Sequence, residues 1–113
     1  MADCLFCGIV AREVSADIVA ETDLTVAFRD INPQAPTHIL VVPREHHATV
    51  GELVAADPRL AAEVLRQAHA IAGSEGLDEG WRLVFNTGKG AGQTVFHVHA
   101  HVLGGRGMTW PPG

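Results

Sequence analysis

The chain has 113 residues, of which 47% are hydrophobic and 19% are charged. This composition is typical of a globular domain and excludes a disordered chain, so we expect one domain over residues 1–113. The net charge is −5 and no cluster of Lys and Arg is present, which argues against a nucleic-acid partner, although main-chain amides can still hold a small anionic ligand.

The N-terminal segment carries two cysteines and no targeting pattern. Residues 1–10 lack a basic region, their apolar run is too short for a signal peptide, and no run of about 20 apolar residues follows elsewhere. We therefore expect a cytoplasmic protein that does not enter a membrane. Cys4 and Cys7 are three positions apart, and in a reducing compartment this pair is more typical of a metal or redox site than of a disulfide.

The first half of the chain predicts a short helix and three strands. Residues 5–10 form a short helix with Phe6 and Ile9 on one side. Residues 17–21 and 24–29 are rich in Val and Ile and predict a hairpin, and the prolines within residues 32–36 indicate a turn. Residues 37–42 form a β-branched run that Pro43 closes, which is typical of a buried strand.

The second half predicts one long helix followed by two strands. Asp57 is a good N-cap, Pro58 suits the first helical position and Gly73 is expected to end the helix. Apolar residues recur between them at helical spacing, namely Leu60, Val64, Ala68 and Ile71. Residues 81–85 and 96–103 are predicted to form strands, joined by a glycine-rich loop over residues 88–92. These elements predict an α+β domain with an antiparallel sheet packed on the helix.

Three histidines alternate with apolar residues in the last predicted strand. Successive side chains of a strand point to opposite faces, so His97, His99 and His101 should share one face. One interpretation is a three-histidine metal site. At about 3.3 Å per residue the outer two Cα atoms lie roughly 13 Å apart, so two of the imidazoles could share an ion but hardly all three.

The other interpretation is nucleophilic and acid–base catalysis, in which neighbouring imidazoles take different roles. Histidine has an ordinary pKa of about 6.5, so a neutral nitrogen is available near neutral pH. The segment before the histidines contains Gly88, Gly90 and Gly92, whose main-chain amides can approach an anion closely. A phosphate-binding loop directly before a row of histidines favours this second interpretation.

The sequence from His97 to Leu103 resembles the pattern of the histidine-triad (HIT) family, in which histidine and an apolar residue alternate three times. Residues 28–38, residues 91–96 and the tail over residues 103–113 resemble the Hint branch of that family, whereas the Fhit-like branch continues differently after its triad. The resemblance implies a fold with about five antiparallel strands, one long helix and a short N-terminal helix.

The resemblance also implies catalytic roles for the histidines. His99 would attack the α-phosphorus of a nucleotide and form a nucleotidyl-histidine that water hydrolyses. His101 would contact the phosphate, His38 would support it from the neighbouring strand, and His97 would complete the group. No metal is implied for this chemistry. The Hint branch cleaves the P–N bond of purine nucleoside 5′-phosphoramidates.

The nucleotide-binding residues follow from the same resemblance. Asp30 would accept hydrogen bonds from the ribose hydroxyls, although an Asp before a turn can also be a capping residue. The apolar purine slot would comprise Leu5, Phe6, Ile9, Phe28 and Ile31, each of which is also a candidate for plain core. The phosphate and leaving-group side would comprise Asn86, Gly92, Gln93, Thr94 and Val95. Thr94 departs from the family, which commonly has Ser there, and its extra methyl could narrow the leaving-group side.

Two further implications concern a partner subunit and zinc. The tail over residues 104–113, with Trp110, would reach the active site of a second copy, which makes the functional unit a homodimer. Cys4 and Cys7 fit a zinc half-site that His46 and His97 would complete, with His47 as an alternative to His46. A closed site of four protein ligands is structural and not catalytic.

Two alternatives to a Hint-type phosphoramidase remain open. One is a dinucleoside polyphosphate hydrolase of the Fhit-like kind, against which the tail argues. The other is a zinc-stabilised nucleotide-binding protein with little turnover, against which the intact triad argues. The sequence does not decide between adenine and guanine, because an apolar slot stacks on either base.

Overall fold

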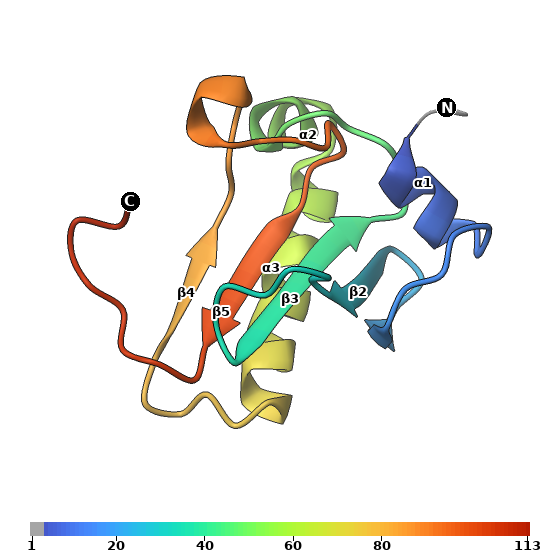
Figure 1. Cartoon of the computed structure of the whole chain (residues 1–113). Coiled ribbons are helices and arrows are strands. Elements are labelled where there is room, and N and C mark those ends of the chain that lie inside the picture. Colours follow the sequence, from blue (N-terminus) through green and yellow to red (C-terminus); the bar gives the residue numbers. More distant parts are fainter. Residues whose placement is uncertain (1–3) are drawn as a thin grey trace.

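The computed structural model describes residues 4–113 and consists of a five-stranded antiparallel sheet with helices on both faces (Figure 1). The elements in chain order are α1 (Leu5–Val10), β1 (Ile18–Glu21), β2 (Thr25–Arg29), β3 (Thr37–Pro43), α2 (Val50–Ala56), α3 (Pro58–Ser74), β4 (Trp81–Val84), the 3₁₀ helix η1 (Lys89–Ala91) and β5 (Ala100–Gly104). The strand order is β1-β2-β3-β5-β4. The predicted α+β class, with one long helix and a short N-terminal helix, is confirmed.

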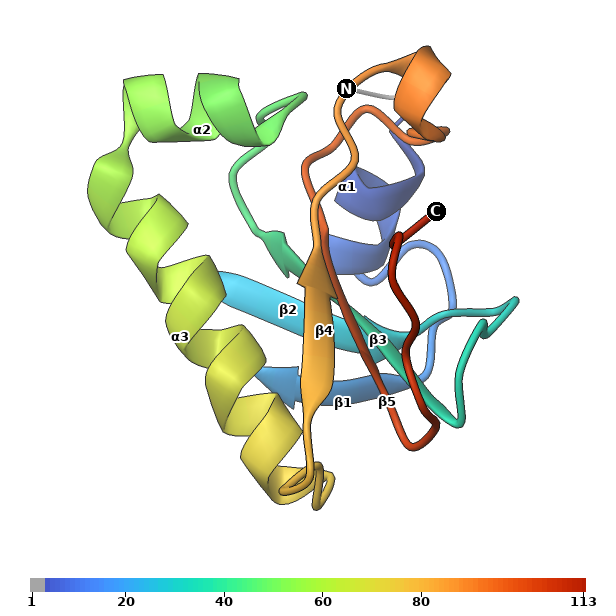
Figure 2. The same ribbon diagram turned by 90° about the vertical axis from the view of Figure 1, so that its left-hand side faces the viewer.

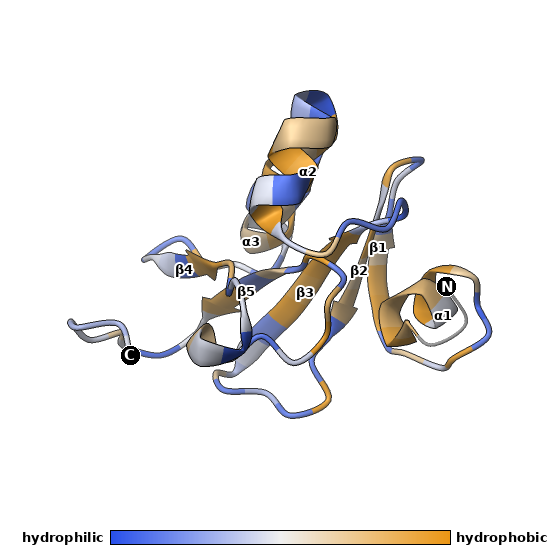
Figure 3. Ribbon diagram, turned by 90° about the horizontal axis from the view of Figure 1, so that it is seen from above, coloured by the Kyte–Doolittle hydropathy of each residue, from blue (hydrophilic) through white to orange (hydrophobic). Residues whose placement is uncertain are grey.

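The two faces of the sheet carry separate apolar cores. The long helix α3 runs across one face (Figure 2). Val64 and Ala68 of the helix belong to one buried cluster with Ile39 and Val102 of the sheet. On the other face α1 covers the sheet, and Phe6 and Ile9 of α1 pack against side chains of β2 and β3. Seen from above, α3 and α1 lie on opposite sides of the strands (Figure 3). Strand β3 is covered from both sides, which explains why all of its residues are buried.

The ends of the helices follow local capping rules, with one correction. The Asp57 carboxylate accepts a hydrogen bond from the Leu60 amide at 3.1 Å, as expected of an N-cap. The prediction that Gly73 ends α3 is wrong, because the helix continues through Ser74. The chain leaves the helical conformation at Gly76, which has a φ of 72°. The glycine that ends the helix is therefore Gly76: its amide bonds to the carbonyl of Gly73 at 3.1 Å and the amide of Leu77 bonds to the carbonyl of Ala72 at 3.0 Å, which is the Schellman motif.

Helix α2 was not predicted, although its start carries a recognisable signal. The Thr49 hydroxyl accepts a hydrogen bond from the Glu52 amide at 3.3 Å, and Glu52 lies three residues after the cap. This Thr-x-x-Glu pattern is a capping box. Buried Leu53 then anchors the short helix to the core on the α3 side of the sheet.

The last strand is shorter than predicted, and two of the three histidines precede it. The ladder of β5 begins at Ala100, because the amide of Val98 bonds to the carbonyl of His47 at 2.7 Å instead of to a neighbouring strand. The alternation persists all the same, since Val98 is buried on the α3 side while His99 packs against Phe6 on the α1 side. In the part of the chain that the structure describes, no helix has the length and apolar character needed to cross a membrane.

Candidate functional site

A cavity of about 660 Å³ lies between α1 and the sheet, within the size range of small-molecule sites. Most of the residues predicted to contact a nucleotide line it, namely Leu5, Phe6, Ile9, Phe28, Asp30, Ile31, Gly92, Thr94, Val95, His99 and His101. Several further lining residues were missed from the sequence, namely Val14, Ser15, Ala16, Asp17, Arg29 and Leu40. Of these, Leu40 follows from strand register, whereas residues 14–16 belong to a loop without a local signal.

The floor of the cavity is a row of side chains that crosses three strands. Phe28 of β2 pairs with Leu40 of β3, and Leu40 pairs with His101 of β5. Neighbouring strands are about 4.8 Å apart, so the row spans roughly 10 Å from an apolar end to an imidazole. Phe6 covers the row from α1, with its ring centroid 5.3 Å from that of Phe28 and 5.0 Å from that of His99. The cavity is therefore apolar at one end and lined by histidines at the other.

Hydrogen bonding determines which nitrogen of His99 carries its proton. Nδ1 of His99 lies 2.8 Å from the carbonyl oxygen of His97. A carbonyl only accepts, so Nδ1 must donate, and in the neutral ring Nε2 then has a free lone pair. Burial lowers the pKa of His99 below its ordinary value, which keeps the ring neutral at neutral pH. His99 thus has the state that a nucleophile requires.

A second chain of hydrogen bonds orients His101. The amide of Gln34 donates to Nδ1 of His38 at 3.0 Å, which leaves the proton of neutral His38 on Nε2. That nitrogen lies 2.9 Å from Nδ1 of His101 and donates to it, so His101 carries its own proton on Nε2. Within residues 4–113, Nε2 of His101 is the buried side-chain polar atom that has no hydrogen-bond partner. Burial first, and His99 and His38 next, lower the pKa of His101 to about 4.

A buried donor without a partner is costly, and a ligand oxygen would satisfy it. Because His101 lines the cavity next to His99, with ring centroids 4.9 Å apart, one bound group can face both imidazoles. The arrangement can hold an anionic oxygen on the Nε2–H of His101 while the lone pair of His99 Nε2 faces the atom to which that oxygen is attached.

Asp30 makes a hydrogen bond of the kind expected of a capping residue, and it also lines the cavity. One carboxylate oxygen accepts a hydrogen bond from the amide of Asn32 at 2.8 Å, and the other lies 3.4 Å from Nε2 of His38. A carboxylate has about four acceptor positions, so these two contacts leave room for a ligand hydroxyl. The two interpretations of Asp30 are therefore compatible.

The glycine-rich loop is held from below by Gln93. Its side chain is 2% exposed and bonds to the amide of Gly88 at 2.9 Å and to the carbonyl of Ala48 at 2.8 Å. Gln93 was predicted among the nucleotide contacts, but its amide group is used within the protein, and its side chain positions the loop. Asn86 and Trp110 also lie outside the cavity of this chain, and Trp110 is 83% exposed in the tail.

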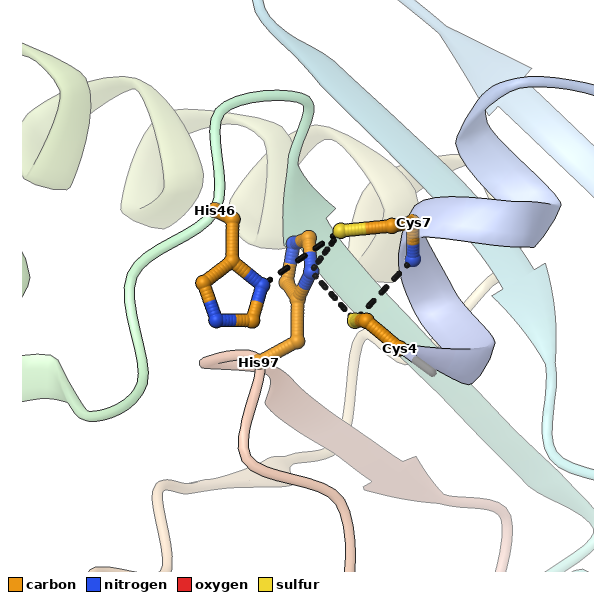
Figure 4. A group of neighbouring side chains, drawn as sticks. All are labelled: Cys4, Cys7, His46 and His97. Atoms are coloured by element: carbon orange, nitrogen blue, oxygen red, sulfur yellow. Dashed lines mark hydrogen bonds between the residues drawn. The ribbon is translucent and has the colours of Figure 1, made fainter. Parts of the chain in front are cut away.

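A second group of polar side chains lies near Phe6, outside the lining of the cavity, with the ring centroid of its member His97 6.1 Å from that of Phe6. Cys4, Cys7, His46 and His97 place one ligand atom each within 4.8 Å of one another (Figure 4). The Cys4 and Cys7 sulfurs lie 3.4 and 3.5 Å from Nδ1 of His97, and the Cys7 sulfur lies 3.4 Å from Nδ1 of His46. In a tetrahedral zinc site with bonds of about 2.3 Å to sulfur and 2.0 Å to nitrogen, these atoms are about 3.5 Å apart. The four side chains fit a zinc ion.

A further observation supports that fit. Nε2 of His97 donates to the carbonyl of Pro43 at 2.8 Å, which leaves Nδ1 as a free ligand atom, as is usual for a metal-bound histidine. His47 is not part of the group, because its ring bonds to Glu45 at 2.7 Å, so His46 and not His47 is the fourth candidate ligand.

Comparisons with known proteins agree with this geometry. A family model described as "HIT domain" matches residues 11–108. An uncharacterized HIT-like protein of Synechococcus elongatus is 52% identical, with 98% of this chain and 97% of that protein covered. A 14 kDa zinc-binding protein of Zea mays is 44% identical, with 96% and 87% covered.

Solved structures show the same fold. A HIT family hydrolase from Legionella pneumophila superposes with a TM-score of 0.94 at 51% identity, with 98% of this chain and all of that chain covered. A histidine triad nucleotide-binding protein from Candida albicans superposes with a TM-score of 0.84 at 30% identity, with 96% and 83% covered.

Proposed function

Since this chain belongs to the HIT family, we propose that it is a nucleotide hydrolase that cleaves the P–N bond of purine nucleoside 5′-phosphoramidates. The observation that carries the proposal is the pair of imidazoles at the end of the apolar cavity. His99 offers a lone pair on Nε2, and His101 offers an unpartnered Nε2–H beside it. A nucleophile next to a donor for a phosphoryl oxygen is the arrangement that phosphoryl transfer requires.

The proposed reaction has two displacements at one phosphorus atom. The lone pair of His99 Nε2 attacks the α-phosphorus, the P–N bond of the substrate breaks, and the nitrogen leaves as the amine with a proton taken from water. Water then adds to the phosphorus, its proton goes to the hydroxide left by the first step, and the bond to His99 breaks, which releases the nucleoside monophosphate and the neutral imidazole. The donor on His101 stabilises negative charge on the phosphoryl oxygens in both steps. The Cys-His group holds zinc outside this chemistry, as a structural ion.

The part of the cavity away from the histidines suits the base and the ribose of a purine nucleotide. Phe6 and Phe28 form an apolar slot for the base, and Asp30 offers acceptors for the ribose hydroxyls between the slot and His101. Gly92 and Thr94 border the phosphate end of the cavity. The Hint-like tail over residues 103–113 is the feature that favours a phosphoramidate over a dinucleoside polyphosphate.

We also propose that the working unit is a homodimer in which residues 104–113 of one copy reach the site of the other. Trp110 is exposed and lies outside the cavity of its own chain, so its large apolar side chain is available to a second copy. A monomeric mass by analytical ultracentrifugation at assay concentrations would contradict this part of the proposal.

The function is tested by comparing two substrates under the same conditions. We expect adenosine 5′-phosphoramidate to be turned over with a kcat/KM at least about tenfold above that of a dinucleoside polyphosphate. The rate should persist during short assays with a chelator, because no step uses a metal. A preference for the dinucleoside polyphosphate would show that the protein is a dinucleoside polyphosphate hydrolase. No turnover of either substrate would show that it is a nucleotide-binding protein without hydrolase activity.

The ribose role of Asp30 gives a separate prediction. Asp30→Ala should raise KM about tenfold or more with a smaller loss in kcat, because ribose contacts are made equally in the ground state and the transition state. A 2′-deoxyribonucleotide substrate should show part of the same loss with the unchanged protein. If Asp30→Ala raises KM for ribo- and deoxyribonucleotide substrates by the same factor, Asp30 acts only as the hydrogen-bond acceptor for the amide of Asn32.

A further inference from the structure

Helix α1 and its cap contribute residues both to the Cys-His group and to the lining of the cavity. Cys4 caps the helix and Cys7 lies in its first turn, and Figure 4 shows both thiols directed at His46 and His97. Phe6 and Ile9 of the same helix line the cavity on the side where a base would stack. A helix of six residues is far too short to be stable by itself, so its position depends on what holds it to the rest of the protein.

Within residues 4–113, the side-chain hydrogen bonds from α1 and its cap to the rest of the protein come from Cys4 and Cys7, and an ion pair between Arg12 and Glu21 ties the segment after the helix to β1. In the described part of the chain, the main-chain hydrogen bonds of α1 stay within residues 4–14, and none reaches the sheet. The side-chain hydrogen bonds from Cys4 and Cys7 go to His46 and His97, which lie beyond the end of β3 and before the start of β5. Apolar packing of Phe6 and Ile9 supplies the remaining contacts.

A small displacement of α1 would change the base slot more than the reacting groups. Phe6 forms one wall of the slot against Phe28, so the width of the slot follows the position of the helix. The hydrogen bond from His99 Nδ1 goes to the main-chain carbonyl of His97, and His38 orients His101 from β3. Neither of these bonds involves a residue of α1; the helix reaches the reacting imidazoles through the edge-on packing of Phe6 on His99, with ring centroids 5.0 Å apart, and this contact does not determine which nitrogen carries the proton.

We propose that the Cys-His zinc group positions the wall of the base slot, so that zinc binding and purine binding are coupled through α1. Cys4 and Cys7 are positioning residues for the base, and they do not touch the nucleotide. The inference rests on the proposed function in that the ligand of the cavity is a nucleotide. Because coupling between two sites is reciprocal, zinc strengthens nucleotide binding and the nucleotide strengthens zinc binding by the same factor.

The first measurement compares AMP with ribose 5-phosphate, which lacks the base. Removal of zinc from the wild-type chain, or Cys4→Ser, should weaken AMP binding by about tenfold in calorimetry, within the usual range of coupling. Binding of ribose 5-phosphate should change by less than about twofold. With a phosphoramidate substrate, KM should rise by the same tenfold, and kcat at saturation should stay within about twofold.

A matched control separates this coupling from a general loss of stability. Val64 is fully buried in the core on the α3 face of the sheet, away from both groups. Val64→Ala should lower the melting temperature, as the loss of zinc does, because zinc binding and core packing both contribute to folding. It should leave the zinc content and the ratio of AMP to ribose 5-phosphate affinity unchanged.

The second measurement needs no variant. The zinc affinity of the wild-type chain, measured by competition with a chromophoric chelator, should rise about tenfold when AMP is saturating and should not change with ribose 5-phosphate. Equal zinc affinity with and without AMP would overturn the inference, as would an equal loss of AMP and ribose 5-phosphate binding on zinc removal. Failure of AMP to bind the zinc-loaded protein would instead overturn the proposed function on which the inference rests.

Discussion

His99→Asn is expected to lower kcat for a purine nucleoside phosphoramidate by at least about 10³-fold, because it removes the atom that forms the bond to phosphorus. Binding of AMP should stay within a few-fold of wild type, since the base slot and Asp30 are unchanged. Two measurements check this: single-turnover kinetics for the chemical step and calorimetry for binding. The expected pattern is a protein that binds a nucleotide and does not turn it over.

The exposed histidine of α3 provides the control for this substitution. His69 is exposed and lies on the face of α3 that is turned away from the core. His69→Asn should keep wild-type activity, which shows that losing an imidazole is not harmful in itself. A His99→Asn protein that retains the wild-type rate would contradict the nucleophilic role and would favour direct attack by water.

His101→Ala is expected to lower kcat by about 10²- to 10³-fold, which is the usual effect of removing one donor to a developing oxyanion. The substitution also leaves Nε2 of His38 without its acceptor at 2.9 Å. His101→Gln keeps an N–H donor at a similar reach, so it should recover part of the lost rate. A purely structural role for His101 would instead show as a fall in melting temperature, with kcat in the surviving folded protein unchanged.

Loss of His101 should also make the covalent intermediate visible. When the second displacement is slowed more than the first, the nucleotidyl group accumulates on His99. Acid quenching during a single turnover, followed by peptide mass spectrometry, should locate a nucleotide adduct on the peptide that contains His99. The same peptide should be unmodified in the double variant with His99→Asn. Repeated absence of the adduct from the His101→Ala sample would contradict the two-step reaction.

Much of the fold was predictable because the signals act over a few residues. The cap at Asp57 with Pro58 determines where α3 begins, and the β-branched run before Pro43 determines β3. The same kind of signal was present and overlooked at Thr49, where a capping box starts α2. The end of α3 was mispredicted because two glycines lie close together there, and the left-handed position that ends the helix is at Gly76 and not at Gly73.

The candidate site was also predictable only in part. The alternation of His97, His99 and His101 is a local pattern, and the sequence alone therefore indicated a row of imidazoles and the family to which the chain belongs. The protonated nitrogen of each ring was not available from the sequence. It depends on the carbonyl of His97 for His99 and, for His101, on His38, which is 63 positions away along the chain.

The sequence by itself therefore predicted most of the elements, the histidine row and the pair of cysteines, because spacing along one strand or one helical turn decides these features. Only the tertiary structure decided between His46 and His47 as a zinc ligand, since that choice depends on which ring meets Cys7, 39 residues away in sequence, and which ring pairs with Glu45. Only the tertiary structure showed which distant residues α1 meets, with Cys7 against His46 and Phe6 against Phe28. Contacts of this kind are set by the packing of distant segments, and no local pattern encodes them.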